Sequence, residues 1–487
     1  MSTLAPAVPV MASPWGQISL NRIFWFAVIL LVGVVVITAR PQYPESSLGA
    51  VMVGAAALLP VWLWMAGRVI GLPLFPVYAA THVGTYALPL LYEHPIVSLF
   101  PADNQLIGAA TVTGFLLLGT VTWYLIGHGT STPVTTCLLL NPANADTFFL
   151  VAIAGGTLFS VATTANWLSM DPGLFAIVRA VALALGALGC FALSYRLGRG
   201  ELTPARALLF RVLIAALIFS NVPSLLLITA MSVIVVAALG YTLGARRFPW
   251  LLCLLSVLAF VFLHAGKGDM RAIYWKEDED PTIQPLNYPS FLAEWIRRSA
   301  ANIAAGRSET GEEGQTLLQR ASLMQLLLYE QVMTPDEVSY MNGETYAIIP
   351  ALLIPRIFNP TKIASHEGTY LLNIHYGFQT REATATTTIG FGLLNESYAN
   401  FGYAGVALLA VVLGAYYAAV SRWAQRAPVL SFRSLFAILV ASYAFQTEFA
   451  AGVYVSALFQ STCALLGVAA LFMRRANCRG SAPATLE

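Results

Sequence analysis

Long runs of apolar residues recur along this chain and constrain its fold more than any other feature. They lie near residues 23–39, 48–67, 74–92, 106–127, 147–168, 174–195, 207–220, 222–243, 249–265, 403–421, 432–448 and 452–473. A run of ~20 apolar residues can cross the ~30 Å hydrocarbon core of a bilayer as a helix. Because lipid offers the backbone no hydrogen-bond partners, repeated runs of this length indicate a helical bundle and not a barrel. The sequence therefore predicts an all-α polytopic membrane protein with about twelve transmembrane helices.

The charged residues are concentrated in one polar stretch, residues 266–402. Only 10% of the chain is charged, against about 25% in a soluble domain. The polar stretch holds 10 of the 26 Lys and Arg residues, 16 of the 24 Asp and Glu residues, and all three lysines. We therefore expect an N-terminal bundle over 1–265, an outer catalytic loop with amphipathic helices over 266–402, and a C-terminal bundle with a tail over 403–487. The net charge of +2 gives no indication of nucleic-acid binding.

Arginine clusters between the spans predict the orientation of the chain in the membrane. They occur at 196–206, 246–247, 422–433 and 474–479. With twelve spans, all of them fall on one side together with Arg22 and Arg68, and Arg40 is the minor exception. Cytoplasmic loops are enriched in Lys and Arg. We therefore expect both termini in the cytoplasm and the polar stretch on the outer side.

The polar stretch contains several helical patterns. Residues 288–305 have helical apolar spacing, and residues 316–332 predict an amphipathic helix with its leucines on one side. Thr334, Pro335 and Glu337 stand at the N-cap, N1 and N3 positions of a predicted helix start. Residues 346–354 are apolar but contain a proline, which favours a short interfacial or re-entrant segment.

Five basic residues of the polar stretch lie beside apolar or aromatic residues: Lys267, Arg271, Arg320, Arg356 and Lys362. Lys267 and Arg271 directly follow the ninth span and are one helical turn apart. Fixed cations at a lipid surface suit a lipid-linked diphosphate, because guanidinium groups bind phosphate oxygens bidentately and stabilise a leaving group. Arginines near membrane ends also reach toward lipid headgroups without any catalytic role, and that interpretation stays open for each of them, as it does for Arg179 inside the sixth span.

Four residues are candidates for a general base: His366, Glu367, Asp269 and Glu396. His366 follows the proline-rich basic segment, and histidine titrates closest to neutral pH. Glu396 and Tyr398 precede the tenth span, where they can bind sugar hydroxyls or accept a proton.

Several site types have no counterpart in the sequence. No DxD-like carboxylate pair lies on the cytoplasmic side, which disfavours a metal-dependent nucleotide-sugar transferase, and there is no P-loop, zinc spacing or serine nucleophile elbow. A membrane cysteine protease would need a cysteine in the outer stretch, and this stretch holds none. A transporter of lipid-linked sugars would carry repeated halves and charges near mid-bilayer, whereas charge is nearly absent from the span centres.

The motifs of residues 260–405 resemble those of the oligosaccharide repeat-unit polymerases of bacterial envelopes, the O-antigen or Wzy-type group. They are the Lys-Gly-Asp-Met-Arg sequence after a central span, an arginine in a leucine-rich helix, Gly343-Glu344-Thr345-Tyr346, the segment from Ile354 to Lys362, and a Thr-rich segment leading into Glu-x-Tyr-x-x-Phe-Gly.

The resemblance implies a GT-C-like fold with a large periplasmic loop in the inner membrane. It implies transfer of a growing glycan from undecaprenyl diphosphate to a lipid-linked repeat unit, with no metal and no cofactor. Expected partners are the undecaprenyl-diphosphate-linked oligosaccharide, inner-membrane lipids, and a chain-length regulator and flippase of the same pathway. The implied diphosphate and sugar contacts are the five cations, with Tyr346 and Tyr398. A related ligase, which moves finished glycan to another acceptor, is the main alternative.

Overall fold

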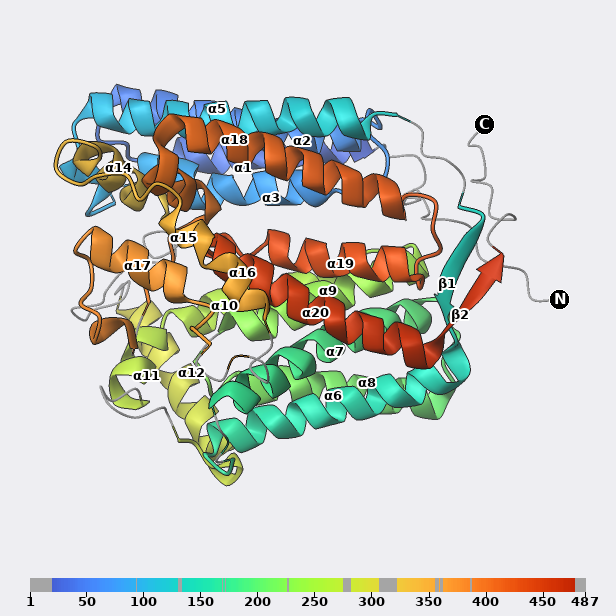
Figure 1. Cartoon of the computed structure of the whole chain (residues 1–487). Coiled ribbons are helices and arrows are strands. Elements are labelled where there is room, and N and C mark those ends of the chain that lie inside the picture. The colour runs from blue at the N-terminus through green and yellow to red at the C-terminus, as the bar shows by residue number, and fades with distance from the viewer. Residues whose placement is uncertain are drawn as a thin grey trace.

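The described part of the chain is mainly helical in the computed structural model (Figure 1). The structure describes residues 20–92, 94–129, 134–168, 170, 172–225, 227–274, 282–305, 322–354, 359, 362–385 and 388–477. The elements before the polar stretch are α1 (Leu20–Thr38), α2 (Pro44–Met65), α3 (Leu74–His82), η1 (Val83–Ala87), α4 (Leu88–Leu91), η2 (Val97–Leu99), α5 (Ala102–Gly127), β1 (Thr136–Leu140), α6 (Pro142–Thr164), α7 (Pro172–Gly198), α8 (Pro204–Asn221), α9 (Leu227–Ala245) and α10 (Trp250–His264).

The polar stretch and the C-terminal part are also helical. The polar stretch contains α11 (Lys267–Tyr274), η3 (Pro285–Asn287), α12 (Tyr288–Ala304), α14 (Met324–Met333), α15 (Glu344–Ala347), α16 (Ile349–Leu353), α17 (Glu367–His375) and η4 (Ala383–Ala385). It is followed by α18 (Gly392–Ala424), α19 (Phe432–Ala444), α20 (Ala451–Phe472) and β2 (Met473–Asn477). The helix expected over 288–305 is confirmed as α12, and the apolar segment 346–354 forms the short helices α15 and α16.

Each of the twelve predicted spans contains a helix, but fewer helices have the length of a membrane span. Within the described residues, seven are long and apolar enough to cross a bilayer: α2, α5, α6, α7, α8, α18 and α20. The pair α10 and α11, bent by 55°, makes an eighth if it is one span. The apolar parts of α1, α9 and α19 are shorter, and the π-helix η1 interrupts the run 74–92. A multi-pass, all-α membrane protein is confirmed, whereas twelve spans stay a prediction.

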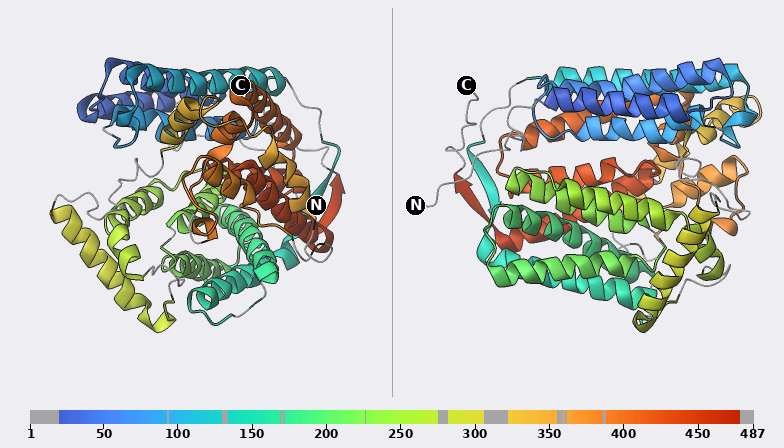
Figure 2. Two further views of the ribbon diagram at one scale, coloured as in Figure 1. Left: turned by 60° about the vertical axis from the view of Figure 1, so that its left-hand side comes forward. Right: turned by 180° about the vertical axis from the view of Figure 1, so that it is seen from behind.

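The helices form two layers around separate apolar cores. In Figures 1 and 2, α1, α2, α3, α5 and α18 form one layer, α6 to α10 form the other, and α19 and α20 run between them. One core joins α2, α3, α5, α14 and α18, and the second joins α6, α7, α8, α9, α19 and α20. A smaller third cluster holds α11 and α12 against the turn between α8 and α9.

Helix ends rich in arginine gather at one end of the bundle. Arg196 at the end of α7 forms an ion pair with Asp146 near the start of α6. Arg422 near the end of α18 donates to the carbonyl of Ile126 near the end of α5, at 2.7 Å. The antiparallel strands β1 and β2 lie at this end, and the helices α11, α12 and α14 to α17 lie at the opposite end (Figure 1). The polar stretch and the arginine clusters are therefore separated along the bundle axis.

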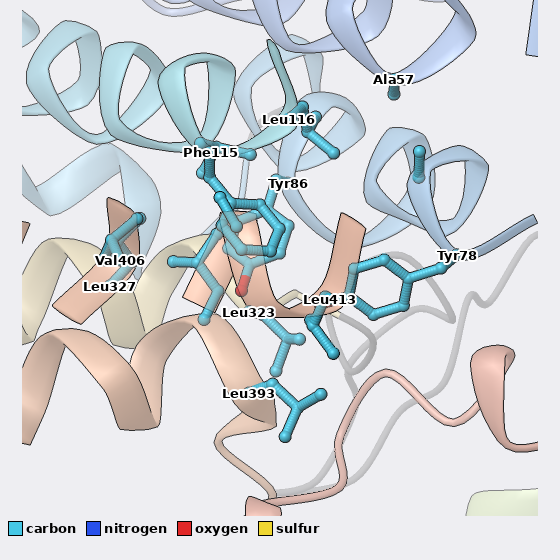
Figure 3. Packing of buried hydrophobic residues seen from close by; sticks show 14 of the residues in the cluster. Ala57, Tyr78, Tyr86, Phe115, Leu116, Leu323, Leu327, Leu393, Val406 and Leu413 are labelled. Atoms are coloured by element: carbon cyan, nitrogen blue, oxygen red, sulfur yellow. The ribbon is translucent and has the colours of Figure 1, made fainter. Parts of the chain in front are cut away.

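Helix α14 is inserted into the first layer. Leu327 of α14 and Leu323, which immediately precedes the helix, lie among Tyr86 and Val406 in the apolar core (Figure 3). It begins at Met324, within the amphipathic helix predicted over 316–332, and the first residues of that prediction lie outside the described residues.

The helix start predicted at Thr334 is wrong. Residues 334–337 form a turn. The Thr334 hydroxyl contacts Tyr376 Oη at 2.9 Å, so it is engaged with another element and caps no helix.

Candidate functional site

A sharp kink in α18 organises the end of the bundle that carries the polar stretch. At Gly402 the backbone has φ 60° and ψ −146°, a conformation that is essentially confined to glycine. A side chain here would also meet Tyr340, whose Oη lies 2.8 Å from the position of an added Cβ. The kink interrupts the helical hydrogen bonding, so carbonyl groups in the preceding turn need other donors.

The segment from Met341 to Gly343 supplies those donors. The Met341 amide donates to the Ala399 carbonyl at 3.0 Å, and the Asn342 amide donates to the Asn400 carbonyl at 3.1 Å. The Gly343 amide donates to Asn400 Oδ1 at 2.9 Å. Two segments that the sequence singled out separately, 343–346 and 396–402, are thus bound to each other.

Side chains continue this contact. Asn400 Nδ2 donates to Thr345 Oγ1 at 2.9 Å, and both side chains are fully buried. Tyr346 stacks on Phe401 with ring centroids 6.1 Å apart and planes inclined by 5°. Tyr398 is buried in edge-to-face contact with the rings of Tyr340 and Tyr403. These tyrosines therefore fix the position of the segment 340–346 on α18.

Glu396 is completely buried beneath this contact. Its Oε2 accepts a hydrogen bond from the Ala451 amide at the first turn of α20, and the carboxylate also hydrogen-bonds with Thr345. A carboxylate is stabilised at a helix N-terminus by the unpaired amides and the helix dipole. Glu396 therefore fastens α15, α18 and α20 together, and its 0% exposure separates it from solvent.

A second buried carboxylate, Glu330 of α14, was not expected from the sequence. It is 0% exposed, and neither of its carboxylate oxygens has a hydrogen-bond partner among the described residues. Burial, and to a lesser extent the charge of Glu396, raises the pKa of Glu330 well above its usual range. The only signal in the sequence was a lone carboxylate in a leucine-rich helix.

The cations Lys267 and Arg271 lie one turn apart in α11, as the sequence predicts. Asp269, between them, accepts a hydrogen bond from Asn302 Nδ2 at 3.1 Å, which ties α11 to α12. Helix α12 is also held to the end of α10 by Trp295, whose Nε1 donates to the Leu263 carbonyl at 2.6 Å. Asp269 therefore takes part in the packing of α11 against α12.

His366 immediately precedes α17, at its N-cap position, and its side chain is exposed. The surrounding protein lowers its pKa, and the Arg179 guanidinium of α7 lowers it further. The neutral imidazole, which can accept a proton, is therefore favoured near neutral pH. Lys362 lies four residues earlier and is half-buried. Arg320 and Arg356 lie outside the described residues.

The predicted site residues thus lie in three groups at one end of the bundle. Tyr346, Glu396 and Tyr398 belong to the contact at the kink of α18. The α11 group comprises Lys267, Asp269 and Arg271, and the third group comprises Lys362 and His366. In the described part of the chain, no cluster of three or more His, Cys, Asp or Glu side chains could hold a metal ion.

One model of a known protein family matches the part of the chain that contains the kink of α18. Residues 322–475 match the model of the family described as O-antigen polysaccharide polymerase Wzy. This match confirms the resemblance to the Wzy-type polymerases. It runs from just before α14 to β2 and contains the whole contact between segments 340–346 and 396–402. No curated protein and no solved structure matches the chain, so the likeness to the GT-C group stays a prediction.

Proposed function

We propose that the protein polymerises oligosaccharide repeat units at the periplasmic face of the inner membrane. The observation that carries this proposal is the Wzy family match over 322–475, because its residues build the outer end of the bundle where the polar helices gather. The separation of these helices from the arginine-rich ends supports the periplasmic orientation, with both termini in the cytoplasm. The expected division into 1–265, 266–402 and 403–487 is part of the same proposal.

The substrates are two lipid-linked oligosaccharides. The acceptor hydroxyl oxygen bonds to the anomeric carbon of the donor glycan, and the bond from that carbon to the phosphate oxygen breaks. The electron pair leaves with undecaprenyl diphosphate. Lys267, Arg271 and Lys362, together with Arg320 and Arg356, are proposed to hold the diphosphate, since fixed cations stabilise the charge that develops on a leaving group.

Among the candidate bases, His366 has the most suitable surroundings, whereas Glu367 is ion-paired with Arg381 at 2.8 Å. It is exposed, and its lowered pKa keeps the imidazole neutral, so it can accept the proton of the acceptor hydroxyl. Asp269 is engaged with Asn302, and Glu396 is enclosed under the kink of α18. We therefore assign the base to His366 and positioning roles to the two carboxylates.

The experiment uses purified protein with a defined lipid-linked repeat unit. We expect a ladder of lengthening lipid-linked chains from the wild type, and a fall of roughly 100-fold or more in elongation for Arg271→Ala. The matched control is Arg297→Ala in α12, whose side chain is 75% exposed, and it should elongate normally. Normal ladders from Arg271→Ala would contradict the cation assignment.

The same reaction separates the polymerase from the ligase alternative. Loss of glycan from the lipid to a different carrier, without longer lipid-linked chains, would identify a ligase. The chain-length regulator and flippase are proposed as pathway partners, and their effect is measured by adding each to the purified reaction.

A further inference from the structure

We propose that α12 is an interfacial helix, which lies in the plane of the membrane with one exposed apolar face against the lipid. The partner of this face is the lipid surface, at the boundary between acyl chains and headgroups. This membrane contact is separate from the polymerase reaction and does not depend on it. The surface of α12, the length and exposure of α10, and the direction of α12 in the bundle all point to it.

The buried side of α12 fixes the helix to the end of α10. Trp295 Nε1 donates to the Leu263 carbonyl at 2.6 Å, and Asn302 Nδ2 donates to the Ala265 carbonyl at 2.9 Å. Between these two contacts, Ser299 packs so closely on Gly266 that a Cβ added there would lie 2.6 Å from Ser299 Oγ. Helix α12 therefore lies at the level where α10 ends.

The rest of α12 divides into an apolar side and a polar side. Four exposed apolar residues recur every three or four positions and so share one side of the helix: Ala293, Ile296, Ala300 and Ile303. Ile296 and Ile303 are 49% and 55% exposed. The polar side carries Ser290, Glu294, Arg297 and Arg298. A surface helix with separate exposed apolar and polar sides is typical of a helix that lies in a membrane interface.

Helix α10 brings α12 to the depth of that interface. Seven of its large apolar residues have between 49% and 71% of their surface exposed: Leu251, Leu252, Leu254, Leu255, Val257, Leu258 and Val261. In a membrane protein, lipid covers such a surface. The 15 residues of α10 rise ~22 Å, which is less than the ~30 Å of the hydrocarbon core. Because Arg246 and Arg247 just before α10 stay at one membrane surface, His264 reaches no further than the opposite boundary between acyl chains and headgroups.

The direction of α12 agrees with this depth. In Figures 1 and 2, α12 runs across the direction of α6, α7 and α8, at the end of the bundle opposite β1 and β2. Membrane spans tilt by only about 20° on average from the bilayer normal, so a helix that crosses them lies near the membrane plane. A second copy of the chain or a soluble protein could cover the apolar side only by displacing the lipid around the end of α10. We therefore assign that side to lipid.

Spin labels on adjacent residues of α12 test the assignment. Ala300→Cys places a label on the apolar side, and Ala301→Cys is the matched control, because Ala301 is an equally exposed alanine turned about 100° toward the polar side. The full chain is reconstituted in bilayers of phosphatidylcholine and phosphatidylglycerol. Collision rates are measured with molecular oxygen, which concentrates in lipid, and with a nickel chelate, which stays in water. The labelled parent protein gives the background from native cysteines such as the exposed Cys463.

We expect the label at position 300 to collide mainly with oxygen and the label at position 301 to collide mainly with the nickel chelate. Ala293→Cys and Ser290→Cys repeat the comparison nearer the start of α12. Equal access of the nickel chelate to both sides would overturn the proposal, because the apolar side would then face water. Shielding of position 300 from both reagents, with magnetic broadening between labels on two molecules, would assign this side to a second copy instead. None of these readouts requires glycan elongation, so they stand apart from the proposed function.

Discussion

Replacing Asn400 with alanine should undock the segment 341–346 from α18. Asn400 is fully buried, and its side chain makes hydrogen bonds to the Gly343 amide, to Thr345 Oγ1 and to the Glu396 carbonyl, at 2.9, 2.9 and 2.8 Å. A buried polar group left without its partner costs about 1–3 kcal/mol. The Gly343 amide and Thr345 would both lose a partner, so we expect the docked state to weaken by about 2–4 kcal/mol. That corresponds to a rise of roughly 30- to 1,000-fold in the undocked population.

Amide hydrogen exchange of residues 341–343 measures this population, and glycan elongation measured on the same sample shows its effect on activity. Asn373→Ala is the matched control, because Asn373 is equally buried and donates to the Thr369 and Ile389 carbonyls from α17. It should lower overall stability without selectively accelerating exchange at 341–343. If Asn400→Ala changes that exchange by no more than the control does, the docking does not depend on Asn400.

Two further variants test the base and the kink. The acid limb of the pH–rate profile for elongation should lie below the usual histidine pKa of 6.5, because partial desolvation by the surrounding protein and the charge of Arg179 lower the pKa of His366. Arg179→Gln should move that limb to higher pH. An unmoved limb in pH–rate profiles of the two proteins would contradict the assignment of His366. Gly402→Ala should destabilise the protein by about 1–3 kcal/mol and reduce elongation, because its Cβ would lie 2.8 Å from Tyr340 Oη. Gly377→Ala has a similar positive φ but open space around it, so its melting temperature should fall less, and equal losses would refute the steric argument.

The positions of the apolar helices were predictable from the sequence. The number of helices long enough to span a membrane was not. An apolar run in lipid has only the helix available to satisfy its backbone, so each predicted span contains one. Hydropathy does not show where a helix breaks. The run 74–92 has the composition of a span, yet the π-helix from Val83 to Ala87 interrupts it, and α11 bends away from α10 by 55°.

The site was predictable only in part, because its motifs are local and its contacts are not. The sequence singled out Glu396 and Tyr346 but gave no sign that their segments meet at a kink. The hydrogen bond that joins the two segments connects Asn400 and Gly343, which are 57 residues apart in the sequence. It also missed Glu330. The spacing of leucines in α14 predicts a helix with one apolar face and one polar face. Insertion between α5 and α18 buries both faces, and with them the one carboxylate.

Helix α14 of the polar stretch is built into the bundle of membrane helices. Leu323 donates its amide to the Thr85 carbonyl at 3.0 Å and its carbonyl accepts from Asn395 Nδ2 at 3.0 Å, so α14 is bound to η1 and α18 at once. Glu396 adds the start of α20 to the same contact. Because amides of Met341 and Asn342 donate to carbonyl groups just before the kink of α18, the spans and this segment stabilise one another. Substitutions near Asn395 in α18 should therefore disturb the contact between segments 340–346 and 396–402 as strongly as substitutions within that contact.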